Sequence, residues 1–259
     1  MIVGRTSIAF ACLAWSGCAG DPAPHPGPPP AAVAPPRDAA AASKAYETAL
    51  VREAEDPRAA LAELDKAIAA DPEHVLARLH AAELRLSLGE ELARADRDLG
   101  PALKLAPDNA RAHLRAGQIA QQLGDLPRAQ TFLSQATKLK PDWDEPQYEL
   151  ADVWLRMGRA EDAVTAGRKA VELAPDRLEL TMRLVGVLEG AGRPADAAKE
   201  MEAAATRIGK SAPLFRRAAE LFDAAQLHED AVRLRKVADK IDPPPVVPKK
   251  RELPPARKR

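Results

Sequence analysis

The sequence predicts an all-α protein built as a solenoid of about six stacked helix pairs. Three observations support this fold: a repeat of about 34 residues, alanine at the same two places in every repeat, and a composition with 29% charged but only 3% aromatic residues. Such a composition suits stacked helices better than a β-sandwich. The predicted repeats cover 41–74, 75–109, 110–143, 144–177, 178–211 and 212–243. Each ends near a marker residue: Pro72, Pro107, Pro141, Pro175, Gly209 and Pro243.

Two columns of alanine run through these repeats. The first column lies twelve residues before each marker and the second lies five residues before it. A small side chain lets two helix backbones approach closely, whereas a larger one would push them apart. The second helix of each pair is therefore predicted to pack through its alanines. They are Ala60, Ala95, Ala129, Ala163, Ala197 and Ala231, then Ala67, Ala102, Ala136, Ala170, Ala204 and Ala238.

The helix boundaries are also marked. In 144–177 the first helix carries Leu150, Val153 and Trp154 at helical spacing. The second helix of the first repeat begins after Asp56-Pro57, which suits a cap followed by the first helical position. Between the two helices a glycine is expected in the left-handed conformation. It is present in the four central repeats, as Gly89, Gly124, Gly158 and Gly192, and is replaced by Glu55 and Gln226 in the first and last repeats.

The repeats resemble tetratricopeptide repeats (TPRs). In 144–177 the signature positions of that family are occupied by Leu150, Ala151, Trp154, Gly158, Ala163, Ala170 and Pro175. The resemblance implies a right-handed superhelical solenoid whose first helices line a concave face. Two departures stand out. The second repeat is one residue longer and carries Gly100-Pro101, which predicts a kink, and Gly167 stands where other repeats have leucine.

Residues 1–17 are predicted to be a lipoprotein signal peptide. Arg5 is followed by an apolar run over 8–14, too short for the roughly 18–20 residues that span a bilayer. Ser16-Gly17-Cys18 resembles the end of a bacterial lipobox, although Trp15 replaces the usual leucine. The resemblance implies that Cys18 carries a lipid such as palmitate, and Ala19 after it favours the outer membrane. The alternatives are ordinary signal-peptidase cleavage and a cytoplasmic protein.

Both ends flanking the repeats are rich in proline. Residues 18–40 are predicted to form an extended tether after the lipidated cysteine. Residues 244–259 carry six basic side chains against Glu252 and are predicted to be a disordered tail. This tail could contact an anionic surface, such as phospholipid head groups or cell-wall polymer, or simply keep the chain soluble. A net charge of zero predicts no nucleic-acid partner.

No motif for catalysis, metal or cofactor binding is found. Gly209-Lys210-Ser211 resembles a phosphate-binding loop, but Ala204 stands where that loop needs glycine. His228-Glu229 begins like a zinc-protease helix, but Val232 occupies the second histidine position. We therefore expect neither an enzyme nor a small-molecule binder.

A groove on the first helices is the predicted binding site for a protein partner. Tyr148 is the favoured anchor because tyrosine combines apolar area with a polar tip, although it could instead pack between repeats. The Lys/Asn/Arg set with which some TPR proteins clamp a peptide carboxylate is absent, so a helix or an extended segment is expected. The predicted groove residues are Leu79, Glu83, Leu114, Gln118, Gln121, Tyr148, Asp152, Leu155, Arg156, Met182 and Arg216.

Anchor, tether and groove together predict a lipid-anchored scaffold of a Gram-negative envelope. Six repeats behind a lipid anchor resemble the pilotins, which assist assembly of the outer-membrane secretin of type IV pili. Two alternatives remain open: a spacer that binds anionic cell-wall polymer through the basic tail, and a soluble cytoplasmic adaptor. An envelope enzyme, or a subunit of one, is a further class for which no residue constellation is found.

Overall fold

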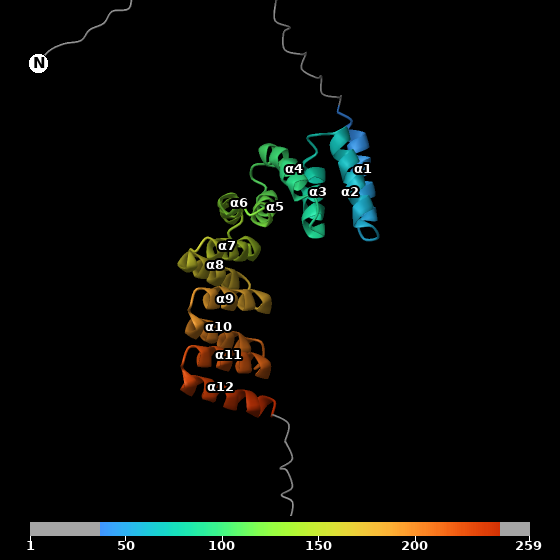
Figure 1. The fold of residues 1–259 in the computed structure, drawn as a ribbon. Helices are drawn as coiled ribbons and strands as arrows, with labels where there is room; N and C mark the ends of the chain where they lie inside the picture. The colour runs from blue at the N-terminus through green and yellow to red at the C-terminus, as the bar shows by residue number, and fades with distance from the viewer. Residues whose placement is uncertain (1–36, 244–259) are drawn as a thin grey trace, which may run out of the picture. The chain divides into compact units, whose positions relative to one another are not determined.

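The computed structural model describes residues 37–243, which fold into twelve α-helices without a strand (Figure 1). The all-α prediction and the packing of consecutive helix pairs are confirmed. The signal peptide, Cys18, most of the predicted tether and the basic tail lie outside the described residues. The helices are α1 (Ala39–Arg52), α2 (Pro57–Ala70), α3 (Val75–Leu88), α4 (Leu92–Leu105), α5 (Ala110–Gln122), α6 (Leu126–Leu139), α7 (Asp144–Arg156), α8 (Ala160–Leu173), α9 (Leu178–Gly190), α10 (Pro194–Arg207), α11 (Ala212–Ala224) and α12 (His228–Ile241).

The first helix begins slightly earlier than the predicted boundary at residue 41. The Asp38 side chain accepts a hydrogen bond from the Ala41 backbone N–H at 2.9 Å. This cap satisfies one of the free donors at the helix start. The helix therefore begins at Ala39 and takes in the last two residues assigned to the tether. None of the twelve helices between residues 37 and 243 is both long and apolar enough to cross a bilayer.

A left-handed residue ends the first helix at the same place in five repeats. The φ angle is +67° at Gly89, +82° at Gly124 and +61° at Gln226, where the last repeat departs from glycine. The additional residue of the second repeat follows Gly89 directly, and Glu91 also takes a left-handed conformation, with φ +49°. The insertion is thus absorbed in the turn. Helix α4 runs as a single element through Pro101, where a kink is predicted.

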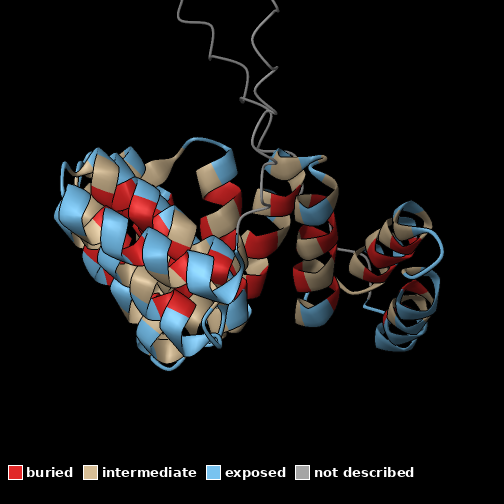
Figure 2. Ribbon diagram, turned by 90° about the horizontal axis from the view of Figure 1, so that it is seen from below, coloured by how far each residue is buried: buried red, intermediate tan, exposed pale blue. Residues whose placement is uncertain are grey.

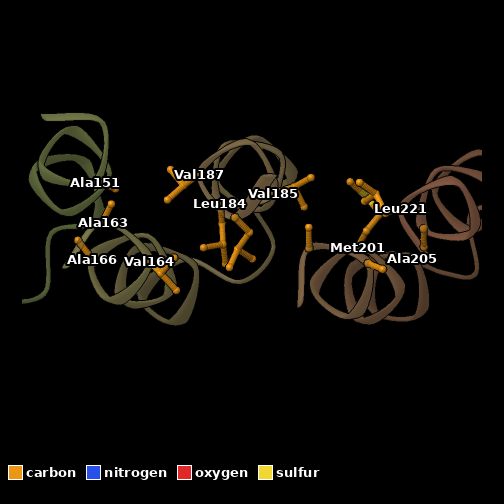
Figure 3. Packing of buried hydrophobic residues seen from close by; sticks show 14 of the residues in the cluster. Ala151, Ala163, Val164, Ala166, Leu184, Val185, Val187, Met201, Ala205 and Leu221 are labelled. Carbon is orange, nitrogen blue, oxygen red and sulfur yellow. The ribbon is translucent and has the colours of Figure 1, made fainter. Parts of the chain in front are cut away.

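The alanine columns lie in the core. All twelve side chains are at most 1% exposed. Figure 2 shows buried residues on the helix faces turned toward neighbouring helices, and exposed residues on the outer faces. In Figure 3, Ala151 of α7 faces Ala163 of α8, while Val187 and Val185 leave α9 on opposite sides. Each helix from α2 to α11 therefore packs between the helix before it and the helix after it.

The buried apolar residues form three clusters. One joins α1, α2 and α3, a second joins α3, α4 and α5, and the third runs from α5 to α12. The first helices also contact one another in succession, α3 with α5, α5 with α7 and α7 with α9. These helices therefore share one continuous surface, which we call the first-helix surface.

A buried arginine lies on α3, the helix that both N-terminal clusters share. Arg85 occupies the place in its first helix that Trp154 and Leu188 occupy in later repeats, and its side chain is 0% exposed. The guanidinium binds Asp65 of α2 at 2.5 Å, Asp98 of α4 at 2.7 Å and Glu91 at 3.2 Å. The lengthened turn after Gly89 thus supplies, through Glu91, one of the three carboxylates that compensate this buried charge.

Candidate functional site

A ladder of charged and amide side chains crosses the first-helix surface. Arg115 of α5 pairs with Glu83 of α3 at 3.0 Å and with Glu145 of α7 at 2.9 Å. Gln118 donates a hydrogen bond to Glu149 at 2.7 Å, and Gln121 donates one to Asp152. These contacts join residues about one repeat apart in sequence. The ladder therefore fixes how α3, α5 and α7 lie against one another.

Tyr148 and Arg183 form the next contact along this surface. The Arg183 guanidinium lies 4.4 Å from the centroid of the Tyr148 ring, within the range of a cation–π interaction. Burial, followed by the nearby charge of Glu149, raises the pKa of the Tyr148 phenol. The hydroxyl is therefore a neutral donor at physiological pH, set at the edge of an apolar region.

An apolar hollow of about 200 Å³ opens between α7 and α9, and we call it the α7/α9 hollow. Glycine stands at two places in its wall where other repeats carry side chains. Gly167 replaces the leucine found at Leu99 and Leu133, and Gly186 occupies the place of Gln118 and Asp152. The hollow is lined by Tyr148, Ala151, Asp152, Leu155, Gly167, Leu180, Arg183, Leu184, Gly186 and Val187. Its size suits one large apolar side chain.

A polar hollow of about 270 Å³ lies on the other side of α7, and we call it the α5/α7 hollow. Glu149 is half-buried in its wall. Burial raises the pKa of this carboxyl, whereas the hydrogen bond from Gln118 acts in the opposite direction. The hollow is lined by Leu86, Gln118, Gln121, Gln122, Glu149 and Arg156.

Most of the predicted groove residues meet around these two hollows. Leu79 and Glu83 line a separate hollow nearer the N-terminal end of the array. Met182 is 47% exposed and Arg216 pairs with Asp242 at 2.8 Å, both away from the two hollows. The residues that do meet are Gln118, Gln121, Tyr148, Asp152, Leu155 and Arg156.

Leu114 corrects the predicted groove. Its side chain is 0% exposed and belongs to the core that contains Ala129 and Leu133. Leu114 shares its place in the repeat with Tyr148 and Met182. The Leu114 side chain therefore lies in the helix interface, and Leu79, at the same place in its repeat, is also buried in the core at 5% exposure.

Several lining residues were not among the predicted ones, notably Glu149, Arg183 and Gly186. The sequence does contain signals for them. Gly186 stands in a column that is polar in the second, third, fourth and sixth repeats, and Glu149 interrupts a column that carries Arg115 and Arg183. Gly186 and Glu149 each differ from the residue type found at the same place in other repeats. Such differences mark where the surface of one repeat differs from that of the others.

The fold defines the class of the protein as a helical-repeat scaffold. The chain belongs to the tetratricopeptide repeat family. Sequence models of this repeat match residues 50–91, 90–153 and 148–213, which together make up more than half of the chain. The family assignment made from the repeat signature is thereby confirmed.

Solved structures of similar fold are TPR proteins. The MamA protein is 20% identical with a TM-score of 0.59, covering 64% of this chain and 91% of its own. YrrB, described as a TPR protein with an unusual peptide-binding site, is 23% identical with a TM-score of 0.54, covering 70% and 92%. PilF from Pseudomonas aeruginosa is 19% identical with a TM-score of 0.58, covering 79% and 93%. At these identities the likeness concerns the fold. Comparison with curated protein sequences gives no significant match.

Proposed function

We propose that this protein is a non-enzymatic scaffold that binds a segment of another protein on its first-helix surface. The observation that carries the proposal is the apolar α7/α9 hollow, which opens beside a ladder of fixed polar groups. An apolar pocket rimmed by polar side chains supplies both the affinity and the orientation that peptide binding needs. The fold shared with YrrB, a peptide-binding TPR protein by its description, agrees with this role.

We further propose that a lipid on Cys18 anchors the scaffold to the outer membrane, facing the periplasm. The Ser16-Gly17-Cys18 sequence and the proline-rich stretch after it support this location. The combination of a lipid anchor with six repeats, which resembles the pilotins, makes an outer-membrane assembly complex, such as a type IV pilus secretin, the favoured setting.

Site-specific crosslinking tests the binding face. A photoreactive amino acid placed at Tyr148 should capture the partner in living cells, whereas the same group at Glu172, on the exposed side of α8, should not. Affinity capture with Tyr148→Ala plus Asp152→Ala should lose the same partner. Equal capture from both crosslinking positions would reject the first-helix surface as the binding face.

A Cys18→Ser version tests the anchor. It should lose metabolic palmitate labelling and move out of the membrane fraction, while the purified protein keeps its partner. A secretin captured only with Cys18 intact would support the assembly role. Capture of cytoplasmic proteins alone, equally by both versions, would favour the cytoplasmic adaptor. Loss of cell-wall association on deletion of 244–259, with protein partners retained, would favour the spacer.

A further inference from the structure

We infer that the first-helix surface recognises a protein segment by two side chains. One large apolar side chain enters the α7/α9 hollow, and one lysine or arginine pairs with Glu149 in the α5/α7 hollow. The inference rests on the proposed function and adds the chemistry of the bound segment.

The apolar half follows from the two glycines. A Cβ atom added at Gly186 would meet no atom within 4 Å, so the space above this residue is open. A Cβ atom at Gly167 would come within 2.9 Å of a Leu184 methyl group, so Leu184 already fills the room left by the missing leucine and forms the floor. The open space lies on the Gly186 side. Burying an apolar side chain there removes apolar surface from water on both molecules.

The basic half follows from the surroundings of Glu149. Among residues 37–243, Glu149 forms no ion pair with an arginine or lysine, and the neutral side chains of Gln118 and Tyr148 together with the more distant charge of Arg183 offset its burial only in part. The nearby cations have other partners: Arg115 pairs with Glu83 and Glu145, and Arg183 pairs with Glu179 at 3.2 Å. A half-buried carboxylate without a cation is unfavourable, and burial accordingly raises its pKa. A basic side chain from a partner would relieve that state.

The two halves lie close enough for one segment. Tyr148 borders the α7/α9 hollow and Glu149 borders the α5/α7 hollow. Consecutive residues of a helix point about 100° apart, so this dipeptide faces both neighbours of α7 at once. A segment that crosses α7 therefore reaches both hollows.

Overall charge agrees with a basic partner segment. The whole chain has 38 basic and 38 acidic side chains, and residues 244–259 carry six of the basic but only one of the acidic ones. The rest of the chain therefore has five more acidic than basic groups. A basic segment would be attracted to this array over a distance comparable to the Debye length.

A selection with a random dodecapeptide library displayed on phage tests the inference on the full chain. The enriched peptides should share a large apolar residue and a lysine or arginine at a fixed spacing. Gly186→Leu should fill the hollow and weaken their binding about tenfold or more. Thr165→Leu, the matched control on the exposed face of α8, should leave binding unchanged. Glu149→Gln should weaken binding about tenfold, and Glu149→Lys should select an acidic residue at the basic position.

The outcomes separate the inference from the proposed function. Peptides that crosslink at Tyr148 but share no apolar and basic pair, or that bind Gly186→Leu as well as the original chain, would overturn the inference and leave the binding face intact. Peptides that never crosslink at Tyr148 would contradict both. A Cβ atom at Gly186 meets no other atom, and leucine favours a helix more than glycine does, so unfolding of this variant is not expected.

Discussion

Arg85→Ala should destabilise the N-terminal part of the array more than any exposed arginine substitution. The side chain is 0% exposed and binds three carboxylates, which come from α2, from α4 and from the turn before α4. Removing it leaves Asp98, 15% exposed, without its closest cation, while Asp65 at 27% and Glu91 at 50% can still be hydrated.

These exposures set the expected loss in the free energy of unfolding for Arg85→Ala. Removing one partner of a buried ion pair costs about 3–5 kcal/mol. Because two of the three carboxylates keep contact with water, the lower end applies, about 3 kcal/mol. The matched control is Arg128→Ala, whose guanidinium is 46% exposed and pairs with Asp96 at 2.9 Å. An exposed pair of this kind contributes about 1 kcal/mol or less.

Amide hydrogen exchange is the appropriate assay, because repeat arrays can open locally and one global midpoint then averages over several units. Arg85→Ala should accelerate exchange in α3 and α4 and leave α9 to α12 unchanged. Arg85→Leu introduces the residue type found at Leu188 and should remain destabilised, because Asp98 loses its closest cation and keeps only the longer contact with Arg78 at 3.6 Å. Full recovery by leucine, or a loss below about 1 kcal/mol for Arg85→Ala, would refute the electrostatic explanation.

Three further substitutions test other parts of the structure. Ala163→Leu should lower the free energy of unfolding by roughly 1–3 kcal/mol, because the fully buried alanine leaves no room for a larger side chain where α7 and α8 cross. An unchanged midpoint in urea unfolding would contradict this packing. Glu149→Gln should raise stability at pH 7 by about 0.5–1 kcal/mol. The folded-state pKa of Glu149 is raised, so the ionised carboxyl lowers stability above that pKa, and the gain should vanish below pH 4.5 in a pH series of urea titrations. Gln226→Gly should stabilise the protein by about 1 kcal/mol in thermal unfolding, because φ is +61° at this residue and glycine adopts the left-handed conformation at lower cost. A loss of stability would show that the glutamine side chain makes a favourable contact.

The repeat fixes the backbone well enough to be predicted from sequence. The first helices α3, α5, α7, α9 and α11 begin at the first residue of each predicted repeat from the second to the sixth. Alanine, glycine and proline decide how near two backbones come and where a helix ends, and they act locally. A pattern that recurs in every unit therefore carries the fold on its own.

The site could be predicted only in part, because its special features depend on residues that differ from the repeat. Arg85 lies at a place where apolar residues are the rule, and its partners are 20, 6 and 13 residues away in three different elements. Leu114 and Tyr148 share one place in the repeat, yet the first is buried and the second lines a hollow. Which way such a residue turns depends on the neighbouring repeat, and repeat position alone does not encode it.

The α7/α9 hollow shows how a binding site can arise in such an array without altering the fold. It lies next to the repeat that matches the family signature best, where Ala151, Ala163 and Ala170 keep α7 and α8 in close contact. Gly186, beside the open space, lacks a side chain while α9 stays continuous, and Gly167 makes room for Leu184, which forms the floor. Packing of the alanines thus holds the backbone, and the stability of this region does not depend on filling the hollow. A partner side chain can therefore take the space that the other repeats give to their own residues.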